Sequence, residues 1–337
     1  MTLLCPLCKG DGAVRLFESR DRVHALPGIF TVFQCQRCRA VFYRPPLQAG
    51  ELSRYYPDTY GRYRRSGAIR KKKYKGIRRF VLENCYGYPS AEKRPASHID
   101  RWAAFFLSLV MAKDAIPYRG GGNLLDVGCG GGSYLYRVKS WGWNAYGVEP
   151  SAAGAAQGRS LGLNVFQGHI EEAAFPDSFF DVVRLNHVLE HLTDPSRTFC
   201  EIKRILKPDG LVYLTVPNTL SLNFWLFGQN WYGLDAPRHV ISYCPRALRF
   251  LCDATGFEIV EIRFRSGPFN YVRSVKYYLE ETGERWPDWL RHINWPSNRP
   301  IRRVLKPFFL LVDAIRLGDV MKATLKKSVQ GETRSTR

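Results

Sequence analysis

The stretch Leu124-Leu125-Asp126-Val127-Gly128-Cys129-Gly130-Gly131-Gly132-Ser133 decides the fold. Its first half is apolar and contains an acid near its end, which indicates a buried strand. Its second half is a glycine-rich turn that opens a helix expected over residues 133–141. Glycine lets the backbone approach a ligand closely, and the amides at the start of a helix favour polar or anionic groups. The stretch therefore predicts a ligand-binding turn between a strand and a helix.

Outward from this turn, strands and helices alternate along the chain. Such alternation predicts an α/β fold, in which helices cover both faces of a mainly parallel sheet. The expected strands are 124–127, 144–148, 163–166, 180–185, 211–216, 257–264 and 319–325, and the expected helices after the first are 151–161, 194–206 and 245–255.

An acid at the end of the second strand adds to the ligand prediction. In Gly147-Val148-Glu149-Pro150, the Glu149 carboxylate stands where it can accept hydrogen bonds from both ribose hydroxyls of an adenosine ligand. The glycine spacing GxGxG differs from the GxGxxG of nicotinamide dinucleotide sites, which argues against an oxidoreductase.

With these motifs, residues 120–265 and about 318–326 resemble the class I S-adenosylmethionine-dependent methyltransferases. Phe179–Val183 looks like the fourth strand of that family, and 206–216 looks like its fifth strand preceded by a turn at Lys207–Gly210. The segment Asn186–Pro195 is similar to ubiquinone-type O-methyltransferases. The resemblance implies a Rossmann-like sheet that is mostly parallel with an antiparallel last strand, and S-adenosylmethionine as cofactor.

The resemblance also implies which residues bind this cofactor. Asp126 and the turn glycines would hold its methionine part, together with Asn186 at the end of the fourth strand. Glu149 would bind the ribose, and the segment His169-Ile170 would lie against the adenine. Many family members have Asp where this chain has His169, so backbone amides are expected to replace that contact. The implied set is Asp126, Gly128, Gly130, Gly132, Glu149, His169, Ile170 and Asn186.

Three histidines are candidates for the catalytic base, because a hydroxyl acceptor must lose a proton during transfer and imidazole takes protons near neutral pH. His239 follows a long loop that contains Trp225, Trp231 and Tyr232, and it is interpreted either as base or as a residue that ties the loop to the next helix. His187 follows the fourth strand. His191, beside Glu190, is either catalytic or part of a buried polar pair that fixes a short helix.

Two CxxC pairs near the start of the chain predict a metal site. Cys5, Cys8, Cys35 and Cys38 can surround one structural Zn²⁺ tetrahedrally; four ordinary thiols are the alternative. This unit, followed by Arg54-Tyr55-Tyr56-Pro57, resembles methyltransferases of sugars and cell-surface polysaccharides. The resemblance implies a zinc ribbon whose role is structural.

Charge and amphipathic patterns suggest further partners. The chain of 337 residues carries a formal charge of +20, and Lys and Arg are dense between Arg62 and Arg79. This basic run is interpreted as a solvated linker, as a contact for a phosphorylated acceptor or an anionic membrane, or as an RNA site. The amphipathic run 301–317 is interpreted either as a lid over the sheet or as a helix on anionic lipid.

These patterns divide the chain into a zinc ribbon at 1–46, a basic and helical connector at 47–119, a methyltransferase domain at 120–327 with an aromatic insert at 266–317, and a disordered tail at 328–337. No secretory signal is visible, so a cytoplasmic location, with peripheral contact at the inner face of the membrane, is expected. The predicted function is methyl transfer, with O-transfer favoured, to a small acceptor such as a sugar or lipid-linked sugar. An RNA methyltransferase or a non-catalytic zinc-dependent binding module are the alternatives.

Overall fold

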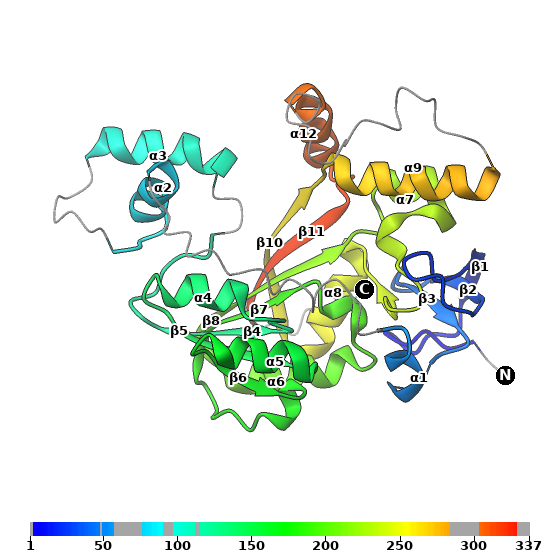
Figure 1. The fold of residues 1–337 in the computed structure, drawn as a ribbon, viewed down its shortest axis with the longest axis horizontal. Coiled ribbons are helices and arrows are strands. Elements are labelled where there is room, and N and C mark those ends of the chain that lie inside the picture. Colours follow the sequence, from blue (N-terminus) through cyan, green and yellow to red (C-terminus); the bar gives the residue numbers. More distant parts are fainter. Residues whose placement is uncertain are drawn as a thin grey trace. The chain divides into compact units, whose positions relative to one another are not determined.

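The structure, a computed structural model, describes residues 3–47, 49–56, 76–89, 97–111, 115–283 and 303–328. The chain forms two compact units, one of Met1–Asp58 with Arg184–Arg337 and the other of Thr59–Val183. Figure 1 shows the succession of helices and strands. The basic run up to residue 75, residues 284–302 of the expected aromatic insert and the expected tail from residue 329 fall outside the described residues.

A seven-stranded sheet has the strand order β10-β11-β8-β7-β4-β5-β6. β4 is parallel to β5 and β5 is parallel to β6, whereas β11 is antiparallel to both β8 and β10. This arrangement confirms the predicted fold class. The strands are β4 (Asn123–Val127), β5 (Asn144–Glu149), β6 (Asn164–Gln167), β7 (Phe180–Asn186), β8 (Leu206–Pro217), β10 (Phe257–Arg265) and β11 (Val320–Lys327).

In the unit Thr59–Val183, the elements after the glycine turn form where the sequence predicts them. α4 (Ser133–Lys139) begins directly after the turn, and α5 (Ala152–Ser160) begins where Ser151 Oγ accepts a hydrogen bond from Gly154 N at 3.3 Å. This side-chain cap satisfies an amide that the helix leaves unpaired. The 3₁₀ helix η1 (Ile170–Glu172) follows β6.

Two further helices of this unit, α2 (Ile77–Cys85) and α3 (His98–Met111), pack against each other. α3 lies in the connector that the sequence predicts to be helical, and it carries a stripe of apolar side chains. Three members of that stripe, Ile99, Trp102 and Phe106, are 80%, 65% and 61% exposed. The stripe is therefore mostly on the surface of the unit.

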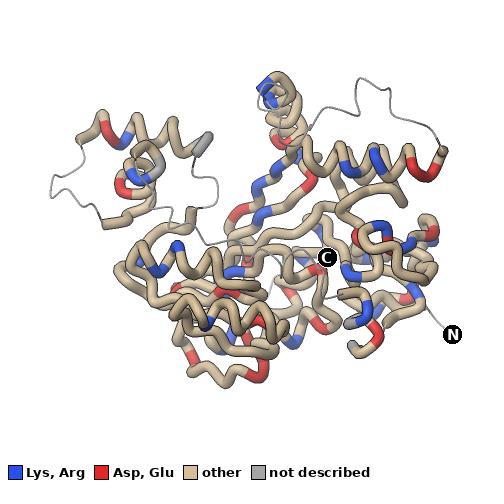
Figure 2. The backbone as a smooth tube through the Cα atoms, in the orientation of Figure 1, with Lys and Arg blue, Asp and Glu red and all other residues tan. Residues whose placement is uncertain are grey.

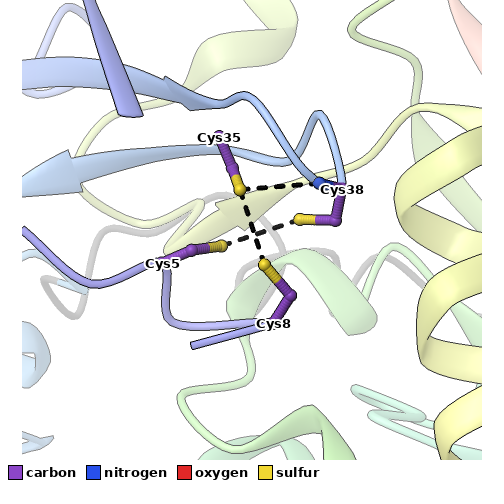
Figure 3. Close-up of side chains that lie close together, drawn as sticks. All are labelled: Cys5, Cys8, Cys35 and Cys38. Atoms are coloured by element: carbon purple, nitrogen blue, oxygen red, sulfur yellow. Dashed lines mark hydrogen bonds between the residues drawn. The ribbon is translucent and has the colours of Figure 1, made fainter. Parts of the chain in front are cut away.

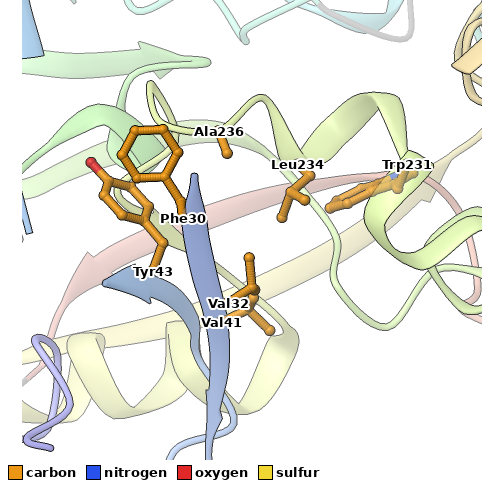
Figure 4. Close-up of a cluster of buried hydrophobic side chains, with 7 residues drawn as sticks. All are labelled: Phe30, Val32, Val41, Tyr43, Trp231, Leu234 and Ala236. Carbon is orange, nitrogen blue, oxygen red and sulfur yellow. The ribbon is translucent and has the colours of Figure 1, made fainter. Parts of the chain in front are cut away.

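In the unit of Met1–Asp58 with Arg184–Arg337, a four-stranded sheet joins the N-terminal segment to the later chain. Its order is β1-β2-β3-β9, and β3 pairs with β9 through Val41↔Ser242 and Phe42↔Ile241. Phe30, Val32, Val41 and Tyr43 share one core with Trp231, Leu234 and Ala236 of the loop before β9 (Figure 4). The cysteine-bearing segment is thus built into this unit. The strands are β1 (Ala13–Ser19), β2 (Phe30–Cys35), β3 (Val41–Arg44) and β9 (Ile241–Ser242).

Helices complete this unit. Figure 2 shows basic residues along α9 and acidic residues at its C-terminal end, where Glu281 pairs with Arg20 and Arg22 next to β1. None of the described helices is long and apolar enough to span a bilayer. The helices are α1 (Ala49–Ser53), α6 (Pro195–Ile205), α7 (Leu222–Phe227), α8 (Pro245–Thr255), α9 (Pro268–Thr282) and α12 (Lys306–Ala314), with the 3₁₀ helices η2 (Leu189–His191), η3 (Gly228–Asn230) and η4 (Tyr232–Leu234).

The expected turn at Lys207–Gly210 falls within the span of β8, Leu206–Pro217. A Cβ on Gly210 would lie 3.1 Å from Lys207 O and 2.7 Å from the Leu206 side chain, so the chain bends back at this point as expected. The ladder between β8 and β11 starts only at Leu211, opposite Lys326. Pro208, which has no N–H, therefore costs that ladder no hydrogen bond.

Candidate functional site

The glycine-rich turn has the backbone that its sequence predicts. Gly128, Gly130 and Gly132 have φ values of 65°, 55° and 76°. A Cβ on Gly132 would come within 2.5 Å of Leu163 Cδ1, so a larger residue would both strain the turn and clash. The amides of Gly128 and Cys129 donate to Val148 O of β5 at 2.8 and 3.1 Å. The turn is therefore anchored to the neighbouring strand.

Glu149 fastens this turn from the end of β5. Its buried carboxylate accepts hydrogen bonds from Gly130 N at 2.7 Å and from Ser151 N at 2.9 Å. The side chain thus joins the turn after β4 to the start of α5. Its predicted role toward a ribose stays a prediction, and so does the role of the buried Asp126 on β4.

The predicted adenine segment lies just after β6. Ile170 is 2% exposed, whereas His169 is exposed and its backbone amide donates to Glu172 Oε2 at 2.8 Å. Gly168 N donates to Glu149 O at 3.2 Å, which connects this segment to the end of β5. The structure thus brings Glu149 and the His169-Ile170 segment together within one unit.

In the other unit, the three predicted catalytic histidines converge on Glu190. Asn186 is the last residue of β7, and His187 follows it with a φ of 56°. This left-handed backbone is uncommon for a residue with a side chain and often marks a functional position. His187 Nδ1 lies 3.1 Å from Glu190 Oε1 on η2, and the His187 side chain is 29% exposed.

Glu190 itself is fully buried. Burial alone would raise the pKa of its carboxyl, but the hydrogen bond from His187 and the nearby imidazoles of His187, His239 and His191 together lower that pKa to about 2. The carboxylate is therefore ionised at neutral pH, in the middle of the histidines.

His191 and His239 face each other edge to face, with ring centroids 4.7 Å apart. His191 Nδ1 lies 2.9 Å from both Arg238 O and the Tyr56 hydroxyl. His239 Nδ1 lies 2.8 Å from Gly233 O, and its Nε2 lies 3.9 Å from Glu190 Oε1. Tyr56 was not among the predicted site residues, although the quoted Arg54–Pro57 motif contains it.

A buried arginine beside this cluster was also not predicted from the sequence. Arg238 Nη1 and Nη2 donate to both carboxylate oxygens of Asp21 at 3.1 and 2.7 Å, and Arg238 Nε donates to Asp235 Oδ1 at 3.0 Å. Arg238 is completely buried. Because Asp21 lies between β1 and β2, this network ties the N-terminal segment to the loop that carries His239.

The four N-terminal cysteines form a closed cluster (Figure 3). Cys5 Sγ lies 3.6 Å from Cys38 Sγ, and Cys8 Sγ lies 3.5 Å from Cys35 Sγ. Thiolates bound tetrahedrally to zinc at about 2.3 Å lie about 3.8 Å apart. The buried side chains thus fit a four-coordinate zinc ion, whose chemistry would be structural because no protein ligand position stays open.

The two cysteine turns have the same backbone geometry. Lys9 N donates to Cys5 O at 3.0 Å, and Arg39 N donates to Cys35 O at 2.9 Å. The residue after each second cysteine is left-handed, with φ of 57° at Lys9 and 66° at Arg39. Two matched turns that point their sulfurs inward are what a shared metal ion requires.

Residues 96–262 match the family model of a methyltransferase domain. Together with the sheet order and the glycine turn, this match defines the class: this part of the chain belongs to the methyltransferase domain family. Membership of this family supports S-adenosylmethionine as the cofactor.

Within that class, the chain is similar to named O-methyltransferases. It is 28% identical over 162 residues to the malonyl-acyl-carrier protein O-methyltransferase of Serratia marcescens, covering 46% of this chain and 63% of that protein. It is 31% identical over 132 residues to a ubiquinone biosynthesis O-methyltransferase of Bradyrhizobium sp., covering 37% of this chain and 49% of that protein. The chain thus spans between about half and just under two thirds of these relatives.

Among solved structures, the chain is similar to a SAM-dependent methyltransferase from Archaeoglobus fulgidus. The two share 23% sequence identity with a TM-score of 0.42, over 63% of this chain and 88% of that chain.

Proposed function

We propose that the protein transfers the methyl group of S-adenosylmethionine to a hydroxyl of a small acceptor. The main support is the pair of His187 and Glu190, which lies directly after β7. The carboxylate of Glu190 is buried, and the side chain of His187 is 29% exposed. The names of the similar O-methyltransferases support transfer to oxygen.

The reaction needs few groups from the protein. The acceptor oxygen attacks the methyl carbon, the carbon–sulfur bond breaks, and its electron pair stays on sulfur, which leaves S-adenosylhomocysteine. Because the sulfonium is a good leaving group, positioning contributes most of the rate. The hydroxyl proton goes to an imidazole.

His187 is the best placed base among the three histidines. With Nδ1–H donating to Glu190, the basic electron pair of the ring belongs to Nε2. The His239 side chain is only 8% exposed, and its Nε2 faces Glu190 and Asp235 at 3.9 and 3.8 Å. We therefore assign proton transfer to His187 and assign His239 a role inside the cluster.

A sugar, or a lipid-linked sugar precursor, is the acceptor class that we propose. The Tyr56 hydroxyl and the imidazole and carboxylate groups around Glu190 offer donors and acceptors suited to a molecule with several hydroxyls. The likeness of the N-terminal unit and the Arg54–Pro57 motif to sugar methyltransferases supports the same class.

The test supplies labelled S-adenosylmethionine with fractionated cell extract to the full-length protein. We expect label in sugar or lipid-linked sugar, and a turnover roughly 10²- to 10⁴-fold lower for His187→Ala. His98→Ala, an exposed histidine at the start of α3, is the matched control and should keep wild-type turnover. Label in RNA alone, or full turnover by His187→Ala, would overturn the proposal.

A further inference from the structure

We propose that Glu190, His191 and His239 bind a divalent transition-metal ion, at a site separate from the four-cysteine cluster. Each of the three residues offers one ligand atom, and these atoms lie within 4.8 Å of one another. Two imidazoles and one carboxylate are a ligand set that binds zinc or iron and leaves positions open for another molecule.

A backbone carbonyl next to Nδ1 favours, in both histidines, the tautomer that such a site needs. Nδ1 of His191 faces Arg238 O, and Nδ1 of His239 faces Gly233 O. A carbonyl oxygen can only accept, so His239 carries the proton on Nδ1 and has its metal-binding electron pair on Nε2. The same tautomer of His191 satisfies Arg238 O, whereas the opposite one would accept from the Tyr56 hydroxyl at the same distance. Metal-binding histidines are commonly oriented by a carbonyl in this way.

Glu190 gives an independent indication. Its Oε1 lies next to His187 Nδ1, but its Oε2 is buried without a hydrogen-bond partner among the residues that the structure describes. A buried carboxylate oxygen without a partner is costly, and a cation would supply the missing interaction. A carboxylate ligand that also accepts a hydrogen bond is typical of metal sites.

The distance between two of the ligand atoms can be compared with that in a zinc site. Ligand atoms held tetrahedrally at 2.0–2.2 Å from one zinc ion are about 3.4 Å apart. His239 Nε2 and Glu190 Oε1 are now 3.9 Å apart. This pair would therefore have to close by about half an ångström, and all three ligand atoms already lie within 4.8 Å of one another.

The role of this metal rests on the proposed function. An acceptor hydroxyl at an open coordination position would become more acidic, as water does on zinc. Its proton would then pass to the neighbouring His187, and the resulting oxygen anion would attack the methyl carbon. The two imidazole ligands favour zinc, iron or another transition metal over magnesium.

The experiment is metal analysis of the full-length protein after saturation with Zn²⁺ and removal of excess ion. We expect about two equivalents per chain, one for each site, and about one in Glu190→Gln and in His239→Ala. His98→Ala should retain both. With Co²⁺ in place of Zn²⁺, the cysteine site should keep its sulfur-to-metal charge-transfer absorption in all variants, which also reports that the fold is intact.

One equivalent in the saturated wild type, or two equivalents in both site variants, would overturn the inference. Glu190→Gln has nearly the same shape and can still accept from His187, so it guards against simple misfolding. The metal count does not depend on the acceptor. Methyl transfer with one metal per chain would support the proposed function and contradict the second metal site. Two metals per chain without methyl transfer to any fraction would support the metal site and contradict the proposed function.

Discussion

At the scale of single residues, the functional groups are held in states that differ from those in water. Glu190 stays ionised although it is buried, since His187, His191 and His239 surround it. Asp319, the residue before β11, is the opposite case. It is 1% exposed, and burial together with the Asp313 carboxylate raises its pKa from 3.8 to about 7.

Asp319 predicts a pH dependence of stability. Because its pKa is higher in the folded chain, the folded state binds more protons than the unfolded state between about pH 4 and 7. Its contribution to the free energy of unfolding therefore decreases as pH rises through this window. Asp319→Asn should remove that decrease, so the variant gains stability relative to wild type as pH rises.

Urea unfolding of both proteins at several pH values between 4.5 and 7.5 measures the difference. Asp209→Asn, on the exposed start of β8, is the control and should follow the wild type. A difference between Asp319→Asn and wild type that stays constant with pH would contradict the prediction.

At the scale of elements, the N-terminal segment supplies side chains to the cluster around Glu190. Tyr56, just after α1, contacts His191, and Asp21, between β1 and β2, holds Arg238. The pairing of β3 with β9 connects the same two parts through the backbone. The cysteine-bearing segment thus supports the loop that carries His239.

The pair between Asp21 and Arg238 should therefore matter strongly for stability. Asp21→Ala leaves part of a fully buried guanidinium without its partner, which typically costs about 3–5 kcal/mol of unfolding free energy. The exposed pair between Arg15 and Glu18 is the control, and Glu18→Ala should cost less than about 1 kcal/mol. Equal melting temperatures for the two variants would be incompatible with this account.

The strands and helices of the methyltransferase domain were predictable because their apolar and glycine patterns are local. The turn 128–132, α5 and the antiparallel β11 occur as expected. The site was only partly predictable. His187, His191 and His239 were found by residue type and position, whereas Tyr56, Asp21 and Arg238 depend on contacts between residues far apart in sequence.

At the scale of the whole molecule, one unit contains both groups of residues that could bind a metal ion. The four cysteines and the cluster around Glu190 belong to Met1–Asp58 with Arg184–Arg337, whereas the glycine turn and Glu149 belong to Thr59–Val183. The proposed function requires that the chain binds S-adenosylmethionine.

Calorimetric titration of the full-length protein tests this binding, with S-adenosylhomocysteine as one ligand and NAD as the other. We predict saturable binding of S-adenosylhomocysteine and none of NAD. Affinity should fall at least about tenfold in Glu149→Gln, the loss expected when a charged hydrogen-bond acceptor is removed. Glu201→Gln, an exposed carboxyl on α6, should bind as the wild type does. Binding of NAD, or no binding of S-adenosylhomocysteine to the wild type, would contradict the account.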